Sequence, residues 1–165
     1  MREQSDDEKI AERSVRDSNT VNGGDGRRIL IVDDEEDVTF FLKEALEDYG
    51  GFEVVTYNDP LLALSDFNNR SSNNERGAAK YDLILLDIKM PKMDGFQLYQ
   101  ELQEMTNQQG YEGKKPKVCF MTAFEVYFEA LKELFPDSYS SVCFIKKPSS
   151  AHDLVKRITK EMNST

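Results

Sequence analysis

Residues 83–95 constrain the fold more than any other stretch of the sequence. They begin with four consecutive apolar residues, reach Asp87, and continue through a proline to an Asp-Gly pair. A short apolar run bounded by turn signals is typical of a strand that is buried on both faces of a parallel sheet. Proline bends the chain after this strand, and Asp94 can cap a helix that starts at Gly95. Asp87 is therefore expected at the sheet edge where ligands bind in open parallel sheets.

The rest of the chain alternates apolar runs with segments of helical period. Along residues 35–49, apolar side chains recur at intervals of three and four residues, and a Gly-Gly pair ends the pattern. The patterns predict five strands, at residues 28–32, 52–57, 81–86, 117–121 and 141–145. They predict five helices, at residues 35–49, from 58 or 59 to about 67, 95–106, 124–135, and from 150 or 151 to 162. Residues 68–80 carry almost no apolar side chains and are expected to be either a surface insertion or an extension of the second helix. This alternation predicts an α/β fold: a five-stranded, doubly wound parallel sheet with the flavodoxin-like order 2-1-3-4-5.

Composition bounds the class of protein. The chain has 165 residues and a net charge of −10, and it has no basic stripe of the kind that nucleic-acid binders usually carry. We divide it into a polar tail at residues 1–26, expected to be disordered or weakly helical, and one domain at residues 27–165. The longest apolar runs are too short for a membrane span or a signal-peptide core, which predicts a cytoplasmic protein. Cys119 and Cys143 lie in strand-like runs, so buried, reduced thiols are expected, with a disulfide as the alternative.

Polar residues follow four of the five predicted strands. In the predicted strand order these groups converge on one edge: Asp33 and Asp34, Asp87, Thr122, and Lys147. Three carboxylates in one pocket need a cation to stay ionised, and an all-oxygen ligand set favours a hard ion such as Mg²⁺. A lysine and a hydroxyl beside the metal make a second site for an anion. This combination suits a carboxylate that attacks phosphorus.

These residues resemble the receiver domain of two-component response regulators, of the stand-alone, chemotaxis type. The resemblance covers about residues 28–162 and rests on four motifs. They are Asp33-Asp34, the sequence DIKMPKMDG that begins at Asp87, Met121-Thr122-Ala123, and Lys147-Pro148.

The resemblance implies a role for each acid of the pocket. Asp87 is expected to accept a phosphoryl group from a histidine kinase or a phosphotransfer protein. Asp34 is expected to bind Mg²⁺ directly and Asp33 through water, while Lys89 offers its backbone carbonyl. Lys89 and Phe124 are also expected to flank the approach of water to the phosphoryl group, which predicts slow autodephosphorylation.

The resemblance also implies how the signal is read. Thr122 is expected to be the switch hydroxyl and Phe144 to be the switch aromatic. Lys147 is expected to pair with the phosphoryl group, and the Lys147–Pro148 peptide bond is expected to be cis. Too little sequence follows the fifth helix for an output domain, so output is expected through contact with a partner protein and without direct DNA binding. The expected contact surface combines the fourth helix, where aromatic residues either pack or form an exposed patch, with the fifth strand and the fifth helix. We expect a monomer or a weak, phosphorylation-dependent dimer.

Three other functions compete with this interpretation. A degenerate receiver would bind partners without phosphate, although no pocket residue is missing. A haloacid-dehalogenase-type phosphatase needs a second Asp two residues after the nucleophile, where this chain has Lys89. A flavodoxin would bind flavin phosphate after the first strand, where the acidic run that starts at Asp33 would repel it.

Overall fold

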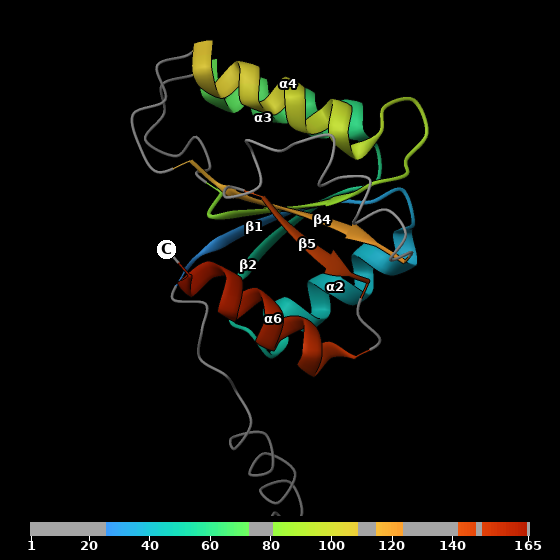
Figure 1. Ribbon diagram of the computed structural model, residues 1–165, viewed down its shortest axis with the longest axis vertical. Helices are drawn as coiled ribbons and strands as arrows, with labels where there is room; N and C mark the ends of the chain where they lie inside the picture. The colour runs from blue at the N-terminus through green and yellow to red at the C-terminus, as the bar shows by residue number, and fades with distance from the viewer. Residues whose placement is uncertain (1–25, 73–80, 109–114, 124–141, 148–149, 165) are drawn as a thin grey trace, which may run out of the picture.

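The computed structural model describes residues 26–72, 81–108, 115–123, 142–147 and 150–164 (Figure 1). Five parallel strands form one sheet in the order β2-β1-β3-β4-β5, which confirms the predicted fold class and strand order. The strands are β1 (Arg28–Val32), β2 (Glu53–Tyr57), β3 (Leu83–Asp87), β4 (Lys117–Thr122) and β5 (Val142–Lys146). The helices within the described ranges are α2 (Glu36–Asp48), α3 (Pro60–Ser72), α4 (Gly95–Gln108) and α6 (Ala151–Asn163). The predicted tail and the predicted helix at 124–135 lie outside the described residues.

The sheet separates two hydrophobic cores. Figure 1 shows α2 and α6 on one face of the sheet and α3 and α4 on the other. Because side chains alternate along a strand, β3 sends Leu83 and Leu85 into the first core and Ile84 and Leu86 into the second. All four of these side chains are buried, as expected for a central strand covered on both faces.

Element boundaries follow the sequence patterns to within a few residues. Strand β3 starts two residues later than predicted and includes Asp87 as its last residue. Helix α3 continues beyond Phe67 to Ser72, which agrees with a helix extension over the first part of the segment that the sequence left as either an extension or a surface insertion. The predicted cap of α4 is present, since Asp94 Oδ1 accepts hydrogen bonds at 2.9 Å from the backbone N–H groups of Phe96 and Gln97. None of the helices in the described ranges is long and apolar enough to cross a membrane.

The prediction of two free thiols is wrong. Cys119 and Cys143 form a disulfide, and both belong to the core on the α2 and α6 face of the sheet. The two residues are register partners in the β4–β5 ladder, with their Cα atoms 4.4 Å apart. Directly opposed positions on neighbouring strands point their side chains to the same face, and this brings the two sulfur atoms together.

Strand register brings the predicted pocket residues to one edge. Val32 pairs with Leu86, so the residues that follow them, Asp33 and Asp87, lie side by side beyond the β1–β3 ladder. On the other side of β3, the β4–β5 ladder ends at the pair Thr122 and Lys146. The carboxyl ends of β1, β3, β4 and β5 therefore meet at this edge.

Candidate functional site

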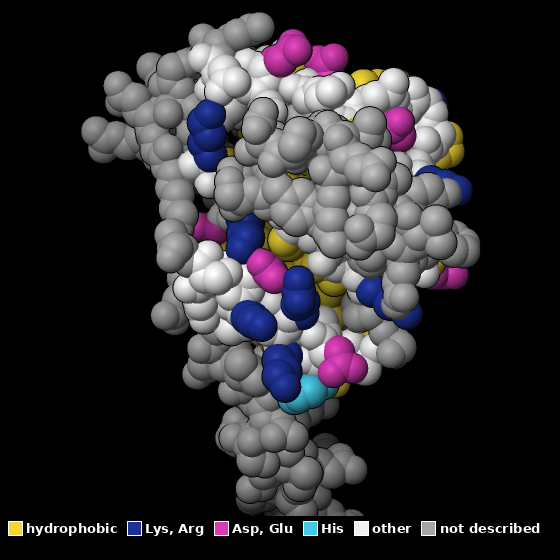
Figure 2. All heavy atoms as spheres, viewed as in Figure 1, with side chains coloured by type: hydrophobic (Ala, Val, Ile, Leu, Met, Phe, Trp, Pro, Cys, Tyr) yellow, Lys and Arg dark blue, Asp and Glu magenta, His cyan; other side chains and the backbone are white. Residues whose placement is uncertain are grey.

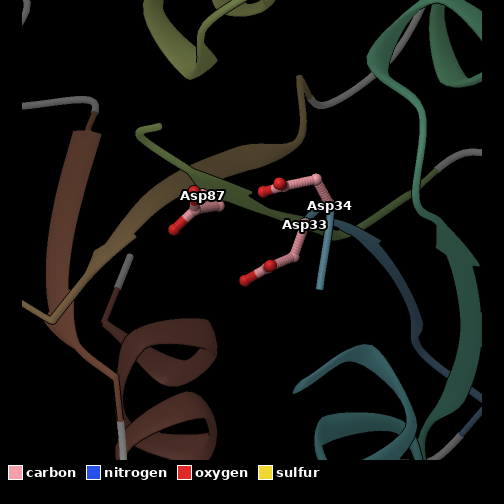
Figure 3. A group of neighbouring side chains, drawn as sticks. All are labelled: Asp33, Asp34 and Asp87. Carbon is pink, nitrogen blue, oxygen red and sulfur yellow. The ribbon is translucent and has the colours of Figure 1, made fainter. Parts of the chain in front are cut away.

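Three carboxylates gather at the carboxyl edge of the sheet (Figure 3). One oxygen from each of Asp33, Asp34 and Asp87 lies within 4.8 Å of the others. Asp33 and Asp87 are buried, whereas Asp34 is exposed. The first two acids come from the turn after β1 and the third from the end of β3, so the group depends on the parallel pairing of these strands.

Backbone and side-chain hydrogen bonds fix the turn after β1. The Asp33 N–H donates to the Tyr57 carbonyl at 3.2 Å and continues the β1–β2 ladder by one bond. The Asp33 carboxylate accepts from the N–H of Glu35, two residues further along the chain, at 3.0 Å. On the side of β2, the Asn58 amide donates to the Asp33 carbonyl at 2.8 Å. The side chain, the N–H and the carbonyl of Asp33 each have a partner.

The loop after Asp87 is held closely against the strand end. Asp87 Oδ2 accepts a hydrogen bond from the Lys89 N–H at 2.9 Å, and the Ile88 N–H donates to the Met121 carbonyl at 3.2 Å. Gly95, the first residue of α4, donates to the Ile88 carbonyl at 3.1 Å. A Cβ at Gly95 would lie 2.2 Å from the Asp87 carbonyl oxygen, so the close approach of α4 to the acid requires glycine.

Lys147 connects the acids to strand β5. Its Nζ lies 2.9 Å from Asp33 Oδ2, 3.0 Å from Asp87 Oδ1 and 2.9 Å from Glu35 Oε1. A lysine ammonium has three donors, and three carboxylates can accept one each. The backbone also holds this residue, because its N–H donates to the Thr122 carbonyl at 2.9 Å. Sequence reasoning placed Lys147 beside the acids but did not identify Glu35 as its partner.

The pKa values reflect burial and the mutual repulsion of the acids. Burial raises the pKa of Asp87 to about 6, and the Asp33 carboxylate raises it as well, while Lys147 and the Lys89 N–H act in the opposite direction. Burial also raises the pKa of Asp33, against the lowering effect of Lys147. Burial alone would lower the pKa of Lys147, but its contacts with Asp33, Glu35 and Asp87 outweigh this and raise it above the ordinary lysine value.

The cluster fits a hard divalent cation. It offers carboxylate oxygens only, and this ligand set suits Mg²⁺ better than metals that prefer histidine or thiolate. Two of the acids are buried, and the pKa of both is raised, so the folded protein keeps these negative charges close together at a cost. A divalent cation would remove this cost by neutralising them.

The other predicted site residues lie around the acids. Thr122 is the last residue of β4 and is 4% exposed. The Phe144 ring is partly buried and stacks on Phe120 with ring centroids 5.7 Å apart. The Lys89 side chain is exposed, and its N–H contacts Asp87. Phe124 and Pro148 lie outside the described residues, so the predicted cis Lys147–Pro148 bond and the water-blocking role of Phe124 stay predictions.

Sequence relatives match most of the chain. CpdR, a response regulator receiver protein of Brucella abortus, is 32% identical over 137 residues, which cover 81% of this chain and 95% of that protein. The transcriptional regulatory protein PcoR of Escherichia coli is 30% identical over 134 residues, covering 80% of this chain and 50% of PcoR. A protein-glutamate methylesterase/protein-glutamine glutaminase of Rhodospirillum rubrum is 33% identical, covering 82% of this chain and 32% of that protein. The chain thus spans only a half and a third of the last two relatives.

Solved structures and a family model agree with these relatives. The response regulator TrrA of Thermotoga maritima, solved in complex with Mg²⁺-BeF, matches with a TM-score of 0.60 and 26% identity over 82% of this chain and 98% of that chain. A CheY-like receiver domain from Methanospirillum hungatei shows the same fold, with a TM-score of 0.61 and 24% identity over 84% of this chain and 94% of that chain. The family model of the response regulator receiver domain matches residues 29–159. The chain therefore belongs to the response regulator receiver domain family.

Proposed function

We propose that this chain accepts a phosphoryl group on Asp87 from a histidine kinase or a phosphotransfer protein in the presence of Mg²⁺. The observation that carries the proposal is the arrangement of Asp87 between two further acids and a lysine. Its carboxylate lies in the three-acid cluster, and Lys147 Nζ is 3.0 Å from Asp87 Oδ1. Residues 27–165 would form the receiver domain and residues 1–26 a tail.

The proposed reaction is an attack of carboxylate on phosphorus. One oxygen of Asp87 forms a bond to phosphorus, the P–N bond of a phosphohistidine breaks, and the imidazole nitrogen leaves with the electron pair. Asp33, Asp34, Asp87 and the backbone carbonyl of Lys89 would hold Mg²⁺, which supplies positive charge for the transferring oxygens. Lys147, already 3.0 Å from Asp87 Oδ1, would stabilise the same negative charge from the side of β5.

The phosphoryl group would change the surface that a partner reads. Thr122 would move its hydroxyl onto the phosphoryl group, and Phe144, which packs on Phe120, would follow as the switch aromatic. The proposed partner surface includes β5, α6 and the predicted fourth helix. Within the described part of this surface, helix α6 contributes the basic residues Lys156, Arg157 and Lys160. Figure 2 shows basic side chains gathered on this side of the molecule. These cations favour a partner with an acidic surface.

The proposal includes a long-lived phosphorylated state in the cytoplasm. A protonated Lys89 cannot act as a base for the attacking water, and Phe124 would block the approach of that water. A disulfide between Cys119 and Cys143 is unusual in that compartment. Counting the free thiols of protein isolated from cells would measure whether this bond is formed there. The second candidate function is a degenerate receiver that binds its partner without phosphate.

Incubation with a small phosphodonor tests the proposal. The full chain is mixed with acetyl phosphate with and without Mg²⁺, beside Asp87→Asn and the control Asp48→Asn, an exposed acid on α2. Intact mass should show one added phosphoryl group in wild type and Asp48→Asn, only with Mg²⁺, and none in Asp87→Asn. Phosphorylation that survives in Asp87→Asn would overturn the proposal. A chain that stays unmodified by both acetyl phosphate and a cognate kinase would point to the degenerate receiver.

A further inference from the structure

We propose that Asn58 is a positioning residue for the metal site, holding the turn that carries Asp33 and Asp34. This inference rests on the proposed Mg²⁺ chemistry and adds a residue from outside the four receiver motifs. Asn58 directly follows β2, an edge strand of the sheet, and contributes none of the three acids.

The Asn58 amide bridges two segments of the chain. Its Nδ2 donates to the Asp33 carbonyl at 2.8 Å and to Thr39 Oγ1 at 2.9 Å. The first partner is the residue after β1, and the second is a buried residue of α2. One amide group therefore joins the strand end to the helix, and the acid pair lies in the short turn between them.

The inventory of donors and acceptors explains why asparagine suits this position. The Thr39 hydroxyl has one hydrogen, and its oxygen lies 3.0 Å from the Glu36 carbonyl, to which it donates. The hydroxyl oxygen then faces Asn58 as an acceptor, as the Asp33 carbonyl does. An amide NH₂ has two hydrogens and can satisfy both acceptors at once. Alanine or leucine at position 58 offers no donor to either one.

Loss of this bridge acts on the metal through Asp33. The Asp33 N–H is tied to the Tyr57 carbonyl, and its carboxylate is tied to the Glu35 N–H and to Lys147. The bond from Asn58 to the Asp33 carbonyl fixes the remaining polar group of this residue. Without the amide, the turn can rotate about the remaining contacts and the three acids lose their shared orientation. Groups that orient metal ligands typically change metal affinity by about 10- to 100-fold when they are removed. For Asn58, we expect the lower end, about 10-fold, because it contacts the ligand residue's backbone.

The test is the Mg²⁺ dissociation constant of the full chain, measured by calorimetry at pH 7.5 without a phosphodonor. Asn58→Ala and the shape-matched Asn58→Leu should each bind Mg²⁺ about 10-fold more weakly than wild type. The control Asn163→Ala removes an asparagine that bonds Arg27 at the other end of the sheet and should leave the dissociation constant unchanged. Thr39→Val keeps the acceptor at Asp33 and should weaken binding less than Asn58→Ala does.

Unfolding in EDTA separates positioning from general stability. If the Asn58 variants unfold earlier than wild type but bind Mg²⁺ equally well, the role is structural and the inference is overturned. Variants that do not fold at all would overturn it in the same way. If wild type itself binds no Mg²⁺, both the inference and the proposed function fail. Equal binding by wild type and the Asn58 variants, with normal phosphorylation, would sink the inference alone.

Discussion

Replacing Asp87 with asparagine should stabilise the metal-free protein at neutral pH. Asp87 is 5% exposed, its carboxylate lies beside that of Asp33, and its pKa is raised from 3.8 to about 6. A carboxyl group with a raised pKa favours the folded state while it is protonated. That contribution is complete below the unfolded-state pKa and is lost as the pH rises through about 6. At pH 7.5 the folded protein therefore carries an ionised group that the unfolded chain would solvate better.

The size of the effect follows from the shift. About two pKa units at about 1.4 kcal/mol each correspond to about 3 kcal/mol between acidic and neutral pH. Asparagine keeps the shape of the side chain without the charge, so Asp87→Asn should recover up to this amount. The lost contact with Lys147 reduces the gain, but Asp33 and Glu35 still accept from its ammonium. For a protein of this size, 3 kcal/mol corresponds to about 6–12 °C in Tm.

Urea unfolding in EDTA at several pH values between 4.5 and 7.5 measures this difference. The free energy of unfolding of Asp87→Asn should exceed that of wild type by an amount that grows as the pH rises from 4.5 and levels off above about pH 6, because the two states bind different numbers of protons only between the unfolded and folded pKa values. Asp48→Asn, an exposed acid in the last turn of α2, is the control, and its difference from wild type should not grow over this range. The reasoning would be refuted if Asp87→Asn were less stable than wild type at pH 7.5. It would also be refuted if the difference in free energy of unfolding between the two proteins did not change with pH.

Three further predictions concern the same pocket. Mg²⁺ affinity should be about tenfold weaker at pH 5 than at pH 7.5, because a proton competes for Asp87, and calorimetry that finds equal affinities would contradict this. Glu35→Gln removes a negative charge next to Lys147 and should speed phosphorylation by acetyl phosphate about threefold. This factor corresponds to the repulsion in water between one negative charge and the incoming phosphoryl group at a distance of about 6 Å. High salt should erase that gain, and a gain that persists in 0.5 M NaCl would argue against a charge effect. Gly95→Ala should destabilise the protein by about 1–3 kcal/mol in thermal unfolding, since its Cβ would meet the Asp87 carbonyl. Helix propensity alone predicts that alanine stabilises the protein by about 1 kcal/mol, so the sign of the measured change decides between the steric clash and the propensity.

The alternation of apolar runs and helical stripes predicted most of the fold because the apolar side chains of each element are the ones that it buries. The apolar run before Asp87 and the helical stripe of α2 report burial directly, and burial is what the sheet and its covering helices impose. Helix α3 runs five residues past Phe67, through a polar segment where no apolar stripe could decide between a helix extension and a surface insertion. The expectation of acids at neighbouring strand ends needed only the strand order.

Contacts that depend on register and on side-chain direction could not be predicted from patterns. The Cys119–Cys143 disulfide requires the two residues to be direct partners across β4 and β5, a fact that only the ladder supplies. Glu35 is 112 residues from Lys147 in the sequence, and nothing in the acidic run after β1 distinguishes it from its neighbours. Asn58 looks like an ordinary turn residue until its two acceptors are seen.

The separation of the hydrophobic interior into two parts has a consequence for how such a protein can evolve. Among the residues that the structure describes, Leu83 and Leu85 belong to one core and Ile84 and Leu86 to the other, so each pair of helices packs on its own face of the sheet. A lineage can therefore remodel the helices on one face for a new partner without compensating substitutions on the opposite face. The pocket, built from strand ends that belong to neither face alone, can stay constant while the surroundings diverge.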